Sequence, residues 1–389
     1  MFAVGWGANQ FSPMLIVYRD RLGLSAGTLG AIFGVYALGL VPGLIVGGAA
    51  SDRYGRRALV IPFVALSPVA SLLLILTRES ATGLGVARFI AGVCSGVVFS
   101  AASAWVQDLA VEAAPGVAAR RAAIALSAGF GAGPLVASLL AQWAPDPLWL
   151  PYVPHLLLGA LATAVVLGAP SPVSAGESDL PPTRLTSLPA AVRGRRFQRV
   201  IVPLAPWVFG SAAFAFVVLP ARISSAHNDA VGFAGLVTAL TLGSGVLLQP
   251  LAQRLEARRA LGGAIVGLAG TVLGLILGML ALALHSRVVV ACAALPLGAG
   301  YGMCLVSGLR ETERLASPSE RGATVAVYYA LTYLGFSVPY LVSVLAGVLT
   351  GVEILGLFAL LALAVLLTVW SAAPAAVTAL GATRSARES

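Results

Sequence analysis

The chain has 389 residues, of which 59% are hydrophobic and only 10% charged, and its formal net charge is +9. Soluble domains carry about 25% charged residues, so a water-soluble protein of this length could not cover so much apolar surface. All 24 basic residues are arginine. The absence of lysine excludes a Walker A phosphate loop, and with it an ATP-driven pump in a single chain.

Apolar runs of spanning length predict twelve transmembrane helices and an all-α membrane protein. They cover residues 2–19, 28–50, 58–77, 82–107, 119–142, 149–169, 200–220, 231–252, 260–284, 287–309, 322–349 and 352–372. The connection between the sixth and seventh runs is long, rich in Pro and Ser, and basic at its end. It predicts an N-terminal six-helix bundle (1–169), a cytoplasmic linker (170–199) and a C-terminal six-helix bundle with a short tail (200–389).

Arginine distribution predicts the orientation in the membrane. With a cytoplasmic N-terminus, only five arginines lie on the outer side: Arg19, Arg21, Arg78, Arg222 and Arg287. The positive-inside rule therefore places both termini in the cytoplasm. The arginine, Ala and Gly usage indicates a GC-rich bacterial genome, hence the bacterial cytoplasmic (inner) membrane. This topology explains the net charge without a nucleic-acid partner. The first residues lack a charged region and a clear cleavage site, so a signal peptide is the weaker interpretation.

The stretch "GGAASDRYGRR" joins the second and third spans. Its notable residues are two glycines, one acid and three arginines: Gly48, Asp52, Arg53, Gly55, Arg56 and Arg57. A plain helix–helix turn would explain the bend at Gly55 and the arginines, but not the aspartate four residues after a glycine. Asp52 can meet a helix N-terminus or an arginine, and Asp108 at the inner end of the fourth span is a candidate partner for a loop arginine.

This motif resembles the signature loop between helices 2 and 3 of the major facilitator superfamily. The count of six plus six spans, the cytoplasmic termini and the central linker extend the resemblance over the whole chain. It implies two six-helix bundles with pseudo-twofold symmetry and secondary transport by alternating access, with the loop as a conformational latch. The stretch "QPLAQRLEARR" after the eighth span looks like a degraded copy, in which Arg254 aligns with Arg53 and Gln253 replaces Asp52.

Span 4 contains Arg88 within a hydrophobic run, which costs about 2.5–3.5 kcal/mol if the charge is central. The alternative is that Arg88 snorkels to the outer surface. Arg88 and Gly92 match the fourth-helix motif of the same family, whose arginine is associated with proton coupling. In span 2, Gly39, Gly43 and Gly47 repeat every four residues and predict a face for close helix packing.

Span 5 contains Gly129, Gly133 and Pro134, which resemble the motif of the family's proton-driven exporters. The match is partial, because Ala137 and Ser138 replace its final glycines. The proline should bend the helix and the glycines should let a neighbouring helix approach. This resemblance favours export.

Span 1 carries Asn9 and Gln10 near mid-membrane, and Pro13 should kink it. These amides are expected to line the substrate cavity, with interhelical hydrogen bonds as the alternative. No span has an acid near its centre, so the candidate proton carriers are Asp108, Glu311 and Glu313 at span ends. Glu353 also lies at an end. This absence weakens the case for proton antiport and for cationic drugs as substrates.

Seven aromatic residues are candidates for lining the cavity, with packing or interface anchoring as the equal alternative. They are Tyr36, Trp105, Trp207, Tyr301, Tyr328, Tyr329 and Tyr333.

The stretch "GLSAG" fits a hydrolase nucleophile motif, but Ser25 only begins span 2, as a helix cap does. His155, His227 and His285 are expected at scattered span ends, where none makes a convincing base. The chain is therefore not expected to be an enzyme. The three cysteines lack metal-type spacing, and we expect no cofactor and no metal.

The leading hypothesis is a monomeric secondary transporter that exports a small amphipathic or drug-like molecule, with protons as a candidate coupling ion. Uptake of a metabolite by the same fold is the alternative, because fold does not fix direction. A non-transporting membrane receptor is a further alternative, which leaves the 48–57 loop unexplained.

Overall fold

The computed structural model describes residues 1–109, 117–170, 189–223, 229–317 and 320–388. Within these ranges the side chains of residues 49, 52, 117–120, 123 and 374–388 are not described. The described chain contains helices and no strands. It forms two compact units: unit 1 comprises Met1–Ser187 and His227–Ala239, and unit 2 comprises Leu188–Ala226 and Leu240–Ser389.

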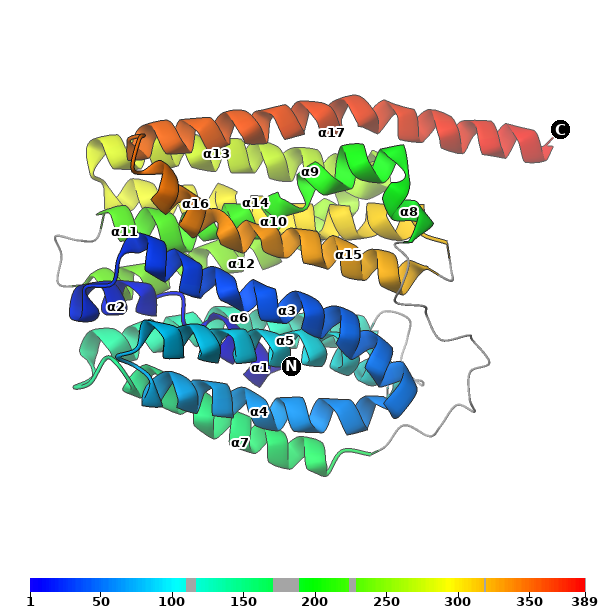
Figure 1. Ribbon diagram of the computed structural model, residues 1–389. Helices are drawn as coiled ribbons and strands as arrows, with labels where there is room; N and C mark the ends of the chain where they lie inside the picture. The colour runs from blue at the N-terminus through cyan, green and yellow to red at the C-terminus, as the bar shows by residue number, and fades with distance from the viewer. Residues whose placement is uncertain (110–116, 171–188, 224–228, 318–319, 389) are drawn as a thin grey trace. The chain divides into compact units, whose positions relative to one another are not determined.

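The helices of unit 1 follow one another with short connections (Figure 1). They are α1 (Phe2–Asn9), α2 (Met14–Leu22), α3 (Ala26–Tyr54), α4 (Arg56–Leu76), α5 (Ala81–Asp108), α6 (Val117–Trp143), the 3₁₀ helix η1 (Leu150–Tyr152) and α7 (Val153–Leu167). The first ten residues of α12 (Ala230–Arg258) also belong to unit 1, and the rest of that helix belongs to unit 2.

Unit 2 contains short helical segments as well as long helices. They are α8 (Ala190–Arg193), η2 (Phe197–Ile201), α9 (Val202–Leu204), α10 (Pro206–Ala213), η3 (Phe214–Val218), α11 (Leu219–Ile223), the remainder of α12, α13 (Gly262–Leu284), α14 (Arg287–Leu315), α15 (Arg321–Tyr333), η5 (Leu334–Ser337), α16 (Val338–Leu345) and α17 (Gly351–Glu388). The segments η2 and η3 are π-helical turns, so the span Phe197–Ile223 is locally widened twice.

Within the described residues, eleven helices are long and apolar enough to cross a membrane. They correspond to the second to twelfth predicted spans. The first predicted span, 2–19, is divided into α1 and α2, and the division falls beside Pro13, where a kink was expected. Pro13 follows the break and has no N–H to donate to the carbonyl of Asn9, so residues 10–13 form turns instead.

Two helix boundaries, at Ser25 and at Gly55, are as expected from the sequence. The hydroxyl of Ser25 accepts a hydrogen bond from the Thr28 N–H at 3.1 Å and caps α3. Ser80 caps α5 in the same way. Gly55 separates α3 from α4 with φ at 91°, a conformation that side chains with a Cβ rarely adopt. The bend at Gly55 therefore depends on the glycine.

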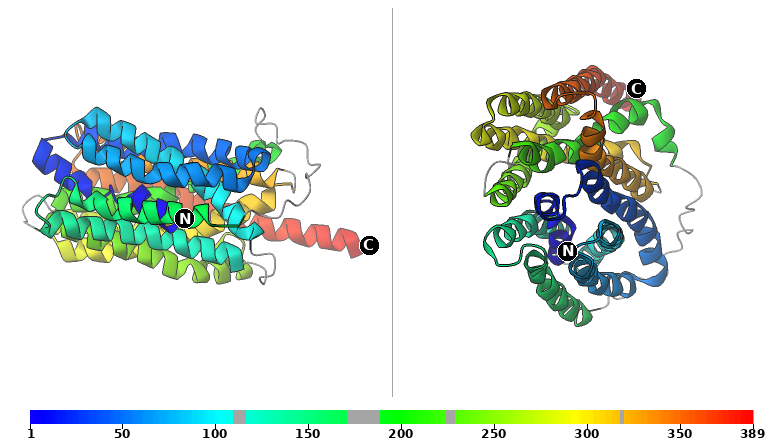
Figure 2. Two further views of the ribbon diagram at one scale, coloured as in Figure 1. Left: turned by 90° about the horizontal axis from the view of Figure 1, so that it is seen from below. Right: turned by 60° about the vertical axis from the view of Figure 1, so that its left-hand side comes forward.

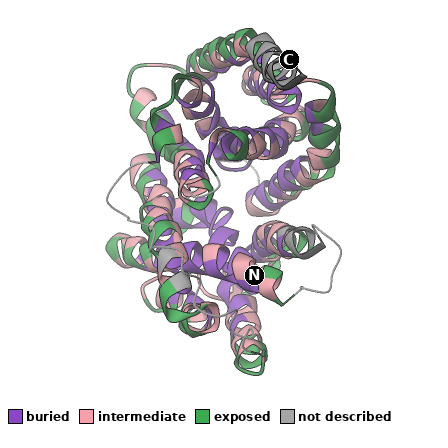
Figure 3. Cartoon of the chain, turned by 90° about the vertical axis from the view of Figure 1, so that its right-hand side faces the viewer, coloured by how far each residue is buried: buried purple, intermediate pink, exposed green. Residues whose placement is uncertain are grey.

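Helix α1 is the centre of unit 1. It contacts α4, α5, α6 and α7, and the end-on view in Figure 2 shows it among the other helices of the unit. Seven of its eight residues are buried. The outer helices carry exposed residues on one side and buried residues on the other (Figure 3). Polar groups on α1 are therefore inside the unit, where they need hydrogen-bond partners.

Helices α3 and α5 pack closely together in unit 1, and glycines on both helices permit this contact. A Cβ atom at Gly39 would lie 2.2 Å from the carbonyl oxygen of Phe89, and one at Gly92 would lie 2.1 Å from that of Tyr36. Gly43, Gly47 and Gly96 make similar approaches. Small residues at this seam bring the two backbones together, as is common where lipid surrounds the helices.

This contact gives a first prediction. Gly92→Ala should lower the thermal unfolding midpoint of the detergent-purified protein, because the new methyl group meets backbone that cannot move aside; overpacking costs about 1–3 kcal/mol. The matched control is Gly85→Ala in the same helix, where nothing lies within 4 Å of the added Cβ. Equal midpoints for the two variants would contradict the proposed role of this seam.

Candidate functional site

The break in span 1 exposes a backbone acceptor inside unit 1. The N–H of Ser12 bonds to the carbonyl of Asn9 at 3.1 Å, three residues back rather than four. The carbonyl of Ala8, four residues before Ser12, instead accepts a hydrogen bond from Nη1 of Arg88 at 2.9 Å. A side chain on α5 therefore binds a carbonyl of the interrupted span, which is the usual way to satisfy non-helical backbone at membrane depth.

Arg88 is buried, with only 2% of its surface exposed. Its guanidinium lies 4.4 Å from the ring centroid of Tyr36, 4.9 Å from that of Phe11 and 5.9 Å from that of Phe33. Cation–π contacts of this kind stabilise a cation most when water is excluded. The alternative in which Arg88 snorkels to the outer surface is therefore wrong.

The positive charge of Arg88 is not matched by an acid in the described structure. Among the described residues no carboxylate forms an ion pair with Arg88, and its buried Nε atom has no hydrogen-bond partner. A buried cation is costly unless it is paired. Arg88 therefore has both the charge and a free donor that an anionic group could use.

The two amides of span 1 connect α1 to other helices. The Nδ2 of Asn9 donates to the carbonyl of Phe130 in α6 at 3.1 Å, and its Oδ1 accepts from the Ser12 hydroxyl at 2.8 Å. The Nε2 of Gln10 donates to the hydroxyl of Ser71 in α4 at 2.7 Å. Both residues are buried. These contacts are the interhelical hydrogen bonds that the sequence left open as the alternative to a cavity lining.

A second buried group, His155, was not expected. It lies near the start of α7, a span end as expected, but it is 1% exposed and its Nδ1 lies 2.7 Å from the Ser71 hydroxyl. A Cβ at Gly7 would lie 2.4 Å from the imidazole, so this glycine makes room for the ring. The signal that could have revealed the site is Ser67 and Ser71, whose spacing of four puts two hydroxyls on one face of α4.

The loop at 48–57 carries a side-chain bond to the end of α5. Arg56 forms an ion pair with Asp108 and also donates to the carbonyl of Ala104 at 2.6 Å. Arg57 donates to the carbonyl of Leu167 at 2.8 Å. These arginines therefore tie α4 to α5 and to the end of α7. The side chain of Asp52 lies outside the described residues.

Arg53 and Gly48, two further residues of the 48–57 loop, make fewer contacts with neighbouring helices. Arg53 lies 5.3 Å from the ring centroid of Tyr54. A Cβ at Gly48 would have nothing within 4 Å, so this glycine permits no close contact within the described residues.

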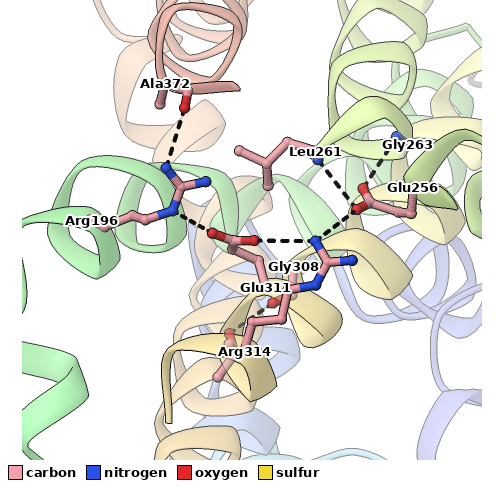
Figure 4. A network of polar contacts seen from close by, with 9 residues as sticks. Arg196, Glu256, Leu261, Gly263, Gly308, Glu311, Arg314 and Ala372 are labelled. Carbon is pink, nitrogen blue, oxygen red and sulfur yellow. Dashed lines mark hydrogen bonds and ion pairs between the residues drawn. The ribbon is translucent and has the colours of Figure 1, made fainter. Parts of the chain in front are cut away.

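Unit 2 holds a network of two buried acids and two partly exposed arginines at the end of α14 (Figure 4). Glu311 accepts a hydrogen bond from Nε of Arg196 at 2.5 Å and lies 3.8 Å from Arg314. Arg314 also lies 3.9 Å from Glu256, whose side chain is fully buried. Arg196 extends the network to α17 by donating to the carbonyl of Ala372 at 3.2 Å. Two acids and two arginines thus connect four helical segments.

Glu256 holds the start of α13 and was missed by the sequence analysis, which aligned Gln253 with Asp52. Its two carboxylate oxygens accept hydrogen bonds from the N–H groups of Leu261 and Gly263 at 3.2 and 3.3 Å. A helix N-terminus has unpaired N–H groups and a partial positive charge, which favour an acid. An acid shortly before a new apolar run was the available signal.

The aromatic candidates fall into separate places. Tyr36 packs on Arg88. Trp105 is buried in α5. Trp207 packs edge-to-face on Phe358, Tyr301 packs on Phe209, and Tyr329 packs on Tyr328. Of these residues, only Tyr36 is brought to Arg88 within unit 1.

The glycines of span 5 bring α6 against α1. A Cβ at Gly129 would lie 2.2 Å from the carbonyl oxygen of Phe2, and one at Gly133 would lie 2.5 Å from that of Trp6. Pro134 lies inside α6. One turn later, Ser138 meets Gly235 of α12 so closely that a Cβ there would lie 1.7 Å from the serine oxygen. A glycine on the neighbouring helix thus accommodates the serine.

No metal site is evident in the part of the chain that the structure describes, where no group of three or more His, Cys, Asp and Glu side chains could hold an ion. The three cysteines are free.

The ion network gives a second prediction. Glu311→Gln should lower the unfolding midpoint, because Arg196 and Arg314 lose a charged partner; such a loss costs about 1–3 kcal/mol. Glu313→Gln is the control, since Glu313 is exposed two residues further on. The measurement is thermal unfolding in detergent. A Glu311→Gln protein as stable as the control would show that the network does not stabilise unit 2.

Comparison with known proteins agrees with this fold. The sequence matches the Major Facilitator Superfamily over residues 1–339. It is 26% identical over 141 residues to an uncharacterized MFS-type transporter of Methanocaldococcus jannaschii, an alignment that spans 36% of either protein. The chain thus spans about a third of the length of that relative.

Three solved structures show the same fold over nearly the whole chain. A POT family transporter in complex with 5-aminolevulinic acid has a TM-score of 0.74 at 14% identity, covering 96% of this chain and 95% of that one. The nucleoside transporter NupG has a TM-score of 0.72 at 13% identity, covering 95% and 96%. The xylose transporter XylE from E. coli has a TM-score of 0.70 at 16% identity, covering 95% and 94%. With a family match over most of its length and this fold, the chain belongs to the major facilitator superfamily.

Proposed function

We propose that this secondary transporter exports a small neutral or anionic molecule across a bacterial inner membrane. The chain is a multi-pass membrane protein of a family made up of transporters. The observation that carries the proposal on substrate charge is Arg88, a buried guanidinium without a described carboxylate partner. Such a group creates a positive potential that attracts anions and repels cations.

The substrate site in this proposal is built around the broken span 1. Arg88 supplies the charge, Asn9 and Gln10 supply polar groups on the same span, and Tyr36 supplies an aromatic face. The aromatic residues Trp105, Trp207, Tyr301 and Tyr329 are proposed as further lining residues. The free Nε of Arg88 is the donor that would reach a carboxylate, phosphate or carbonyl oxygen.

The direction of transport is proposed from span 5. Gly129, Gly133 and Pro134 resemble the exporter motif, and the close approach of the two glycines to α1 supports a packing role for them. Gly92 is proposed to have the same packing role, because it lets α5 approach α3 closely. Both contacts join helices that carry residues of the Arg88 site. Movement of these helices would therefore shift the residues around Arg88.

The 48–57 loop is proposed as a conformational latch that sets the balance between inward-open and outward-open states. The proposed latch comprises the loop residues Gly48, Asp52, Arg53, Gly55, Arg56 and Arg57 together with Asp108 at the end of α5. The ion pair between Arg56 and Asp108 supports this proposal. Of the acids at span ends, Asp108 is thus paired with Arg56 and Glu311 with Arg196. The transporter is proposed to act as a monomer with both termini cytoplasmic.

A third prediction tests Arg88. Arg88→Ala should abolish protein-dependent transport at normal expression, and Arg88→Lys should restore only part of it because the planar group that stacks on the rings is lost. The control is Arg78→Ala, an arginine near the outer end whose side chain is 39% exposed. Wild-type transport by Arg88→Ala would remove Arg88 from the mechanism.

A fourth prediction tests substrate charge and direction together. Cells without their own multidrug pumps are loaded with fluorescein as an anionic probe or ethidium as a cationic probe, and loss of dye is followed. Expression of the transporter should speed fluorescein loss and leave ethidium loss unchanged, since a positive site repels cations. Ethidium export that stops when the proton gradient collapses would contradict the charge proposal, and protein-dependent gain of fluorescein would contradict export.

A further inference from the structure

The end of α14 and the start of α15 form a pocket in unit 2 that the transport function proposed above does not use. Its volume is about 310 Å³, and charged side chains line it: Arg310, Glu313 and Arg314 from α14 and Arg321 from α15. The three residues of α14 share one face, because positions three and four apart are neighbours on a helix. The pocket therefore presents three guanidinium groups and one carboxylate.

The pocket lies where two membrane-spanning helices end. The spans cover Arg287–Leu315 and Arg321–Leu345, so the pocket is at the depth where apolar spans give way to the lipid head groups. Glu313, Arg314 and Arg321 are exposed, and Arg310 is half-buried. Polar groups from the membrane surface can therefore reach these side chains.

Two of the arginines have no acid partner among the described residues. Arg310 donates to the carbonyl of Gln253 in a long hydrogen bond of 3.4 Å, and no described carboxylate forms an ion pair with Arg310 or Arg321. Glu320, the acid beside Arg321 in sequence, instead accepts a hydrogen bond from the N–H of Ala190 at 3.0 Å. The charges of both guanidinium groups are therefore available to an anionic group.

Glu313 is also without an ion pair, although arginines surround it. It lies three residues after Arg310, a spacing at which opposite charges on a helix can meet, yet it pairs with no described arginine. Its carboxylate interacts electrostatically with Tyr329 of α15. The pocket thus offers positive and negative groups side by side that do not neutralise each other by contact.

The remaining arginine of the pocket is engaged by buried acids. Arg314 lies 3.8 Å from Glu311 and 3.9 Å from Glu256 (Figure 4). It therefore belongs to the ion network described above and holds the end of α14 in place. Arg310, Glu313 and Arg321 are the three charged groups of the pocket that a ligand could use.

A ligand for these three groups must carry both charges. Phosphate suits the arginines, because guanidinium groups bind its oxygens with several N–H donors in a fixed geometry. An ammonium group suits Glu313. A purely anionic ligand would be repelled by Glu313, and a purely cationic one by the arginines. A phosphate and an ammonium joined by two carbons make a phosphoethanolamine group, and the depth of the pocket favours a lipid head group as its source.

We propose that Arg310, Glu313 and Arg321 bind the phosphoethanolamine head group of a membrane lipid, with the phosphate on the two arginines and the ammonium on Glu313. This proposal does not depend on which molecule is transported or in which direction. A lipid held in this pocket would connect the end of α14 to the start of α15. The lipid composition of the membrane would then affect how these two helices move.

Native mass spectrometry of the full chain in detergent, with defined lipids added, tests the arginines. We expect Arg321→Gln to weaken the tightest binding of phosphatidylethanolamine about tenfold, the value of one hydrogen bond to a charged group. The control is Arg258→Gln, which removes an exposed arginine at the end of α12 outside the pocket and should bind like the wild type. Equal binding by the two variants would overturn the proposal.

A third variant, Glu313→Gln, tests the second charge. The wild type should bind phosphatidylethanolamine about threefold more tightly than phosphatidylglycerol, which has the phosphate but no ammonium, as one exposed ion pair allows. This preference should disappear in Glu313→Gln, and a preference that survives would overturn the assignment of the ammonium to Glu313. Neither Arg321 nor Glu313 makes a described ion pair, so both variants should fold.

Soluble phosphoethanolamine distinguishes a lipid from a free compound as the source of the group. It has the same two charges but no acyl chains, so we expect it to bind more weakly than the lipid. If it displaced phosphatidylethanolamine at equal concentration, the lipid would be overturned as the ligand of this pocket.

Discussion

The hydrogen bond from Arg88 to the Ala8 carbonyl is the interaction on which unit 1 depends. Membrane interiors tolerate neither an unpaired cation nor an unpaired carbonyl. Here the break in span 1 supplies the carbonyl and α5 supplies the cation, so each satisfies the other. Rings from Phe11, Phe33 and Tyr36 cover the guanidinium. One donor remains unpaired, and this incomplete neutralisation is what makes the site a candidate for binding an anion.

The two units handle buried charge differently. In unit 2 the buried acids Glu256 and Glu311 meet two arginines and a helix N-terminus, so the charges balance and the network joins helices. In unit 1 the described structure leaves Arg88 without a carboxylate. Balanced networks are suited to holding helices together, whereas an unbalanced cation has a reason to bind something else. This asymmetry is the physical reason why Arg88, rather than the ion network of unit 2, is proposed as a substrate-binding group.

Much of the fold followed from composition, because spans in lipid must be long and apolar. The second to twelfth predicted spans, the cap at Ser25 and the bend at Gly55 are examples. The kink of span 1 was expected from Pro13, but the sequence could not reveal that Arg88, 80 residues away, binds the Ala8 carbonyl at this break. His155 was missed because its partner serines are about 85 residues away in sequence.

Electron cryomicroscopy of the full chain in a lipid nanodisc tests the central claim most directly, because it locates the guanidinium of Arg88. The account predicts that span 1 is interrupted at residues 10–13, with Arg88 on the Ala8 carbonyl and between the rings of Phe11 and Tyr36. A continuous helix over residues 2–19, or a guanidinium among the lipid head groups, would contradict it.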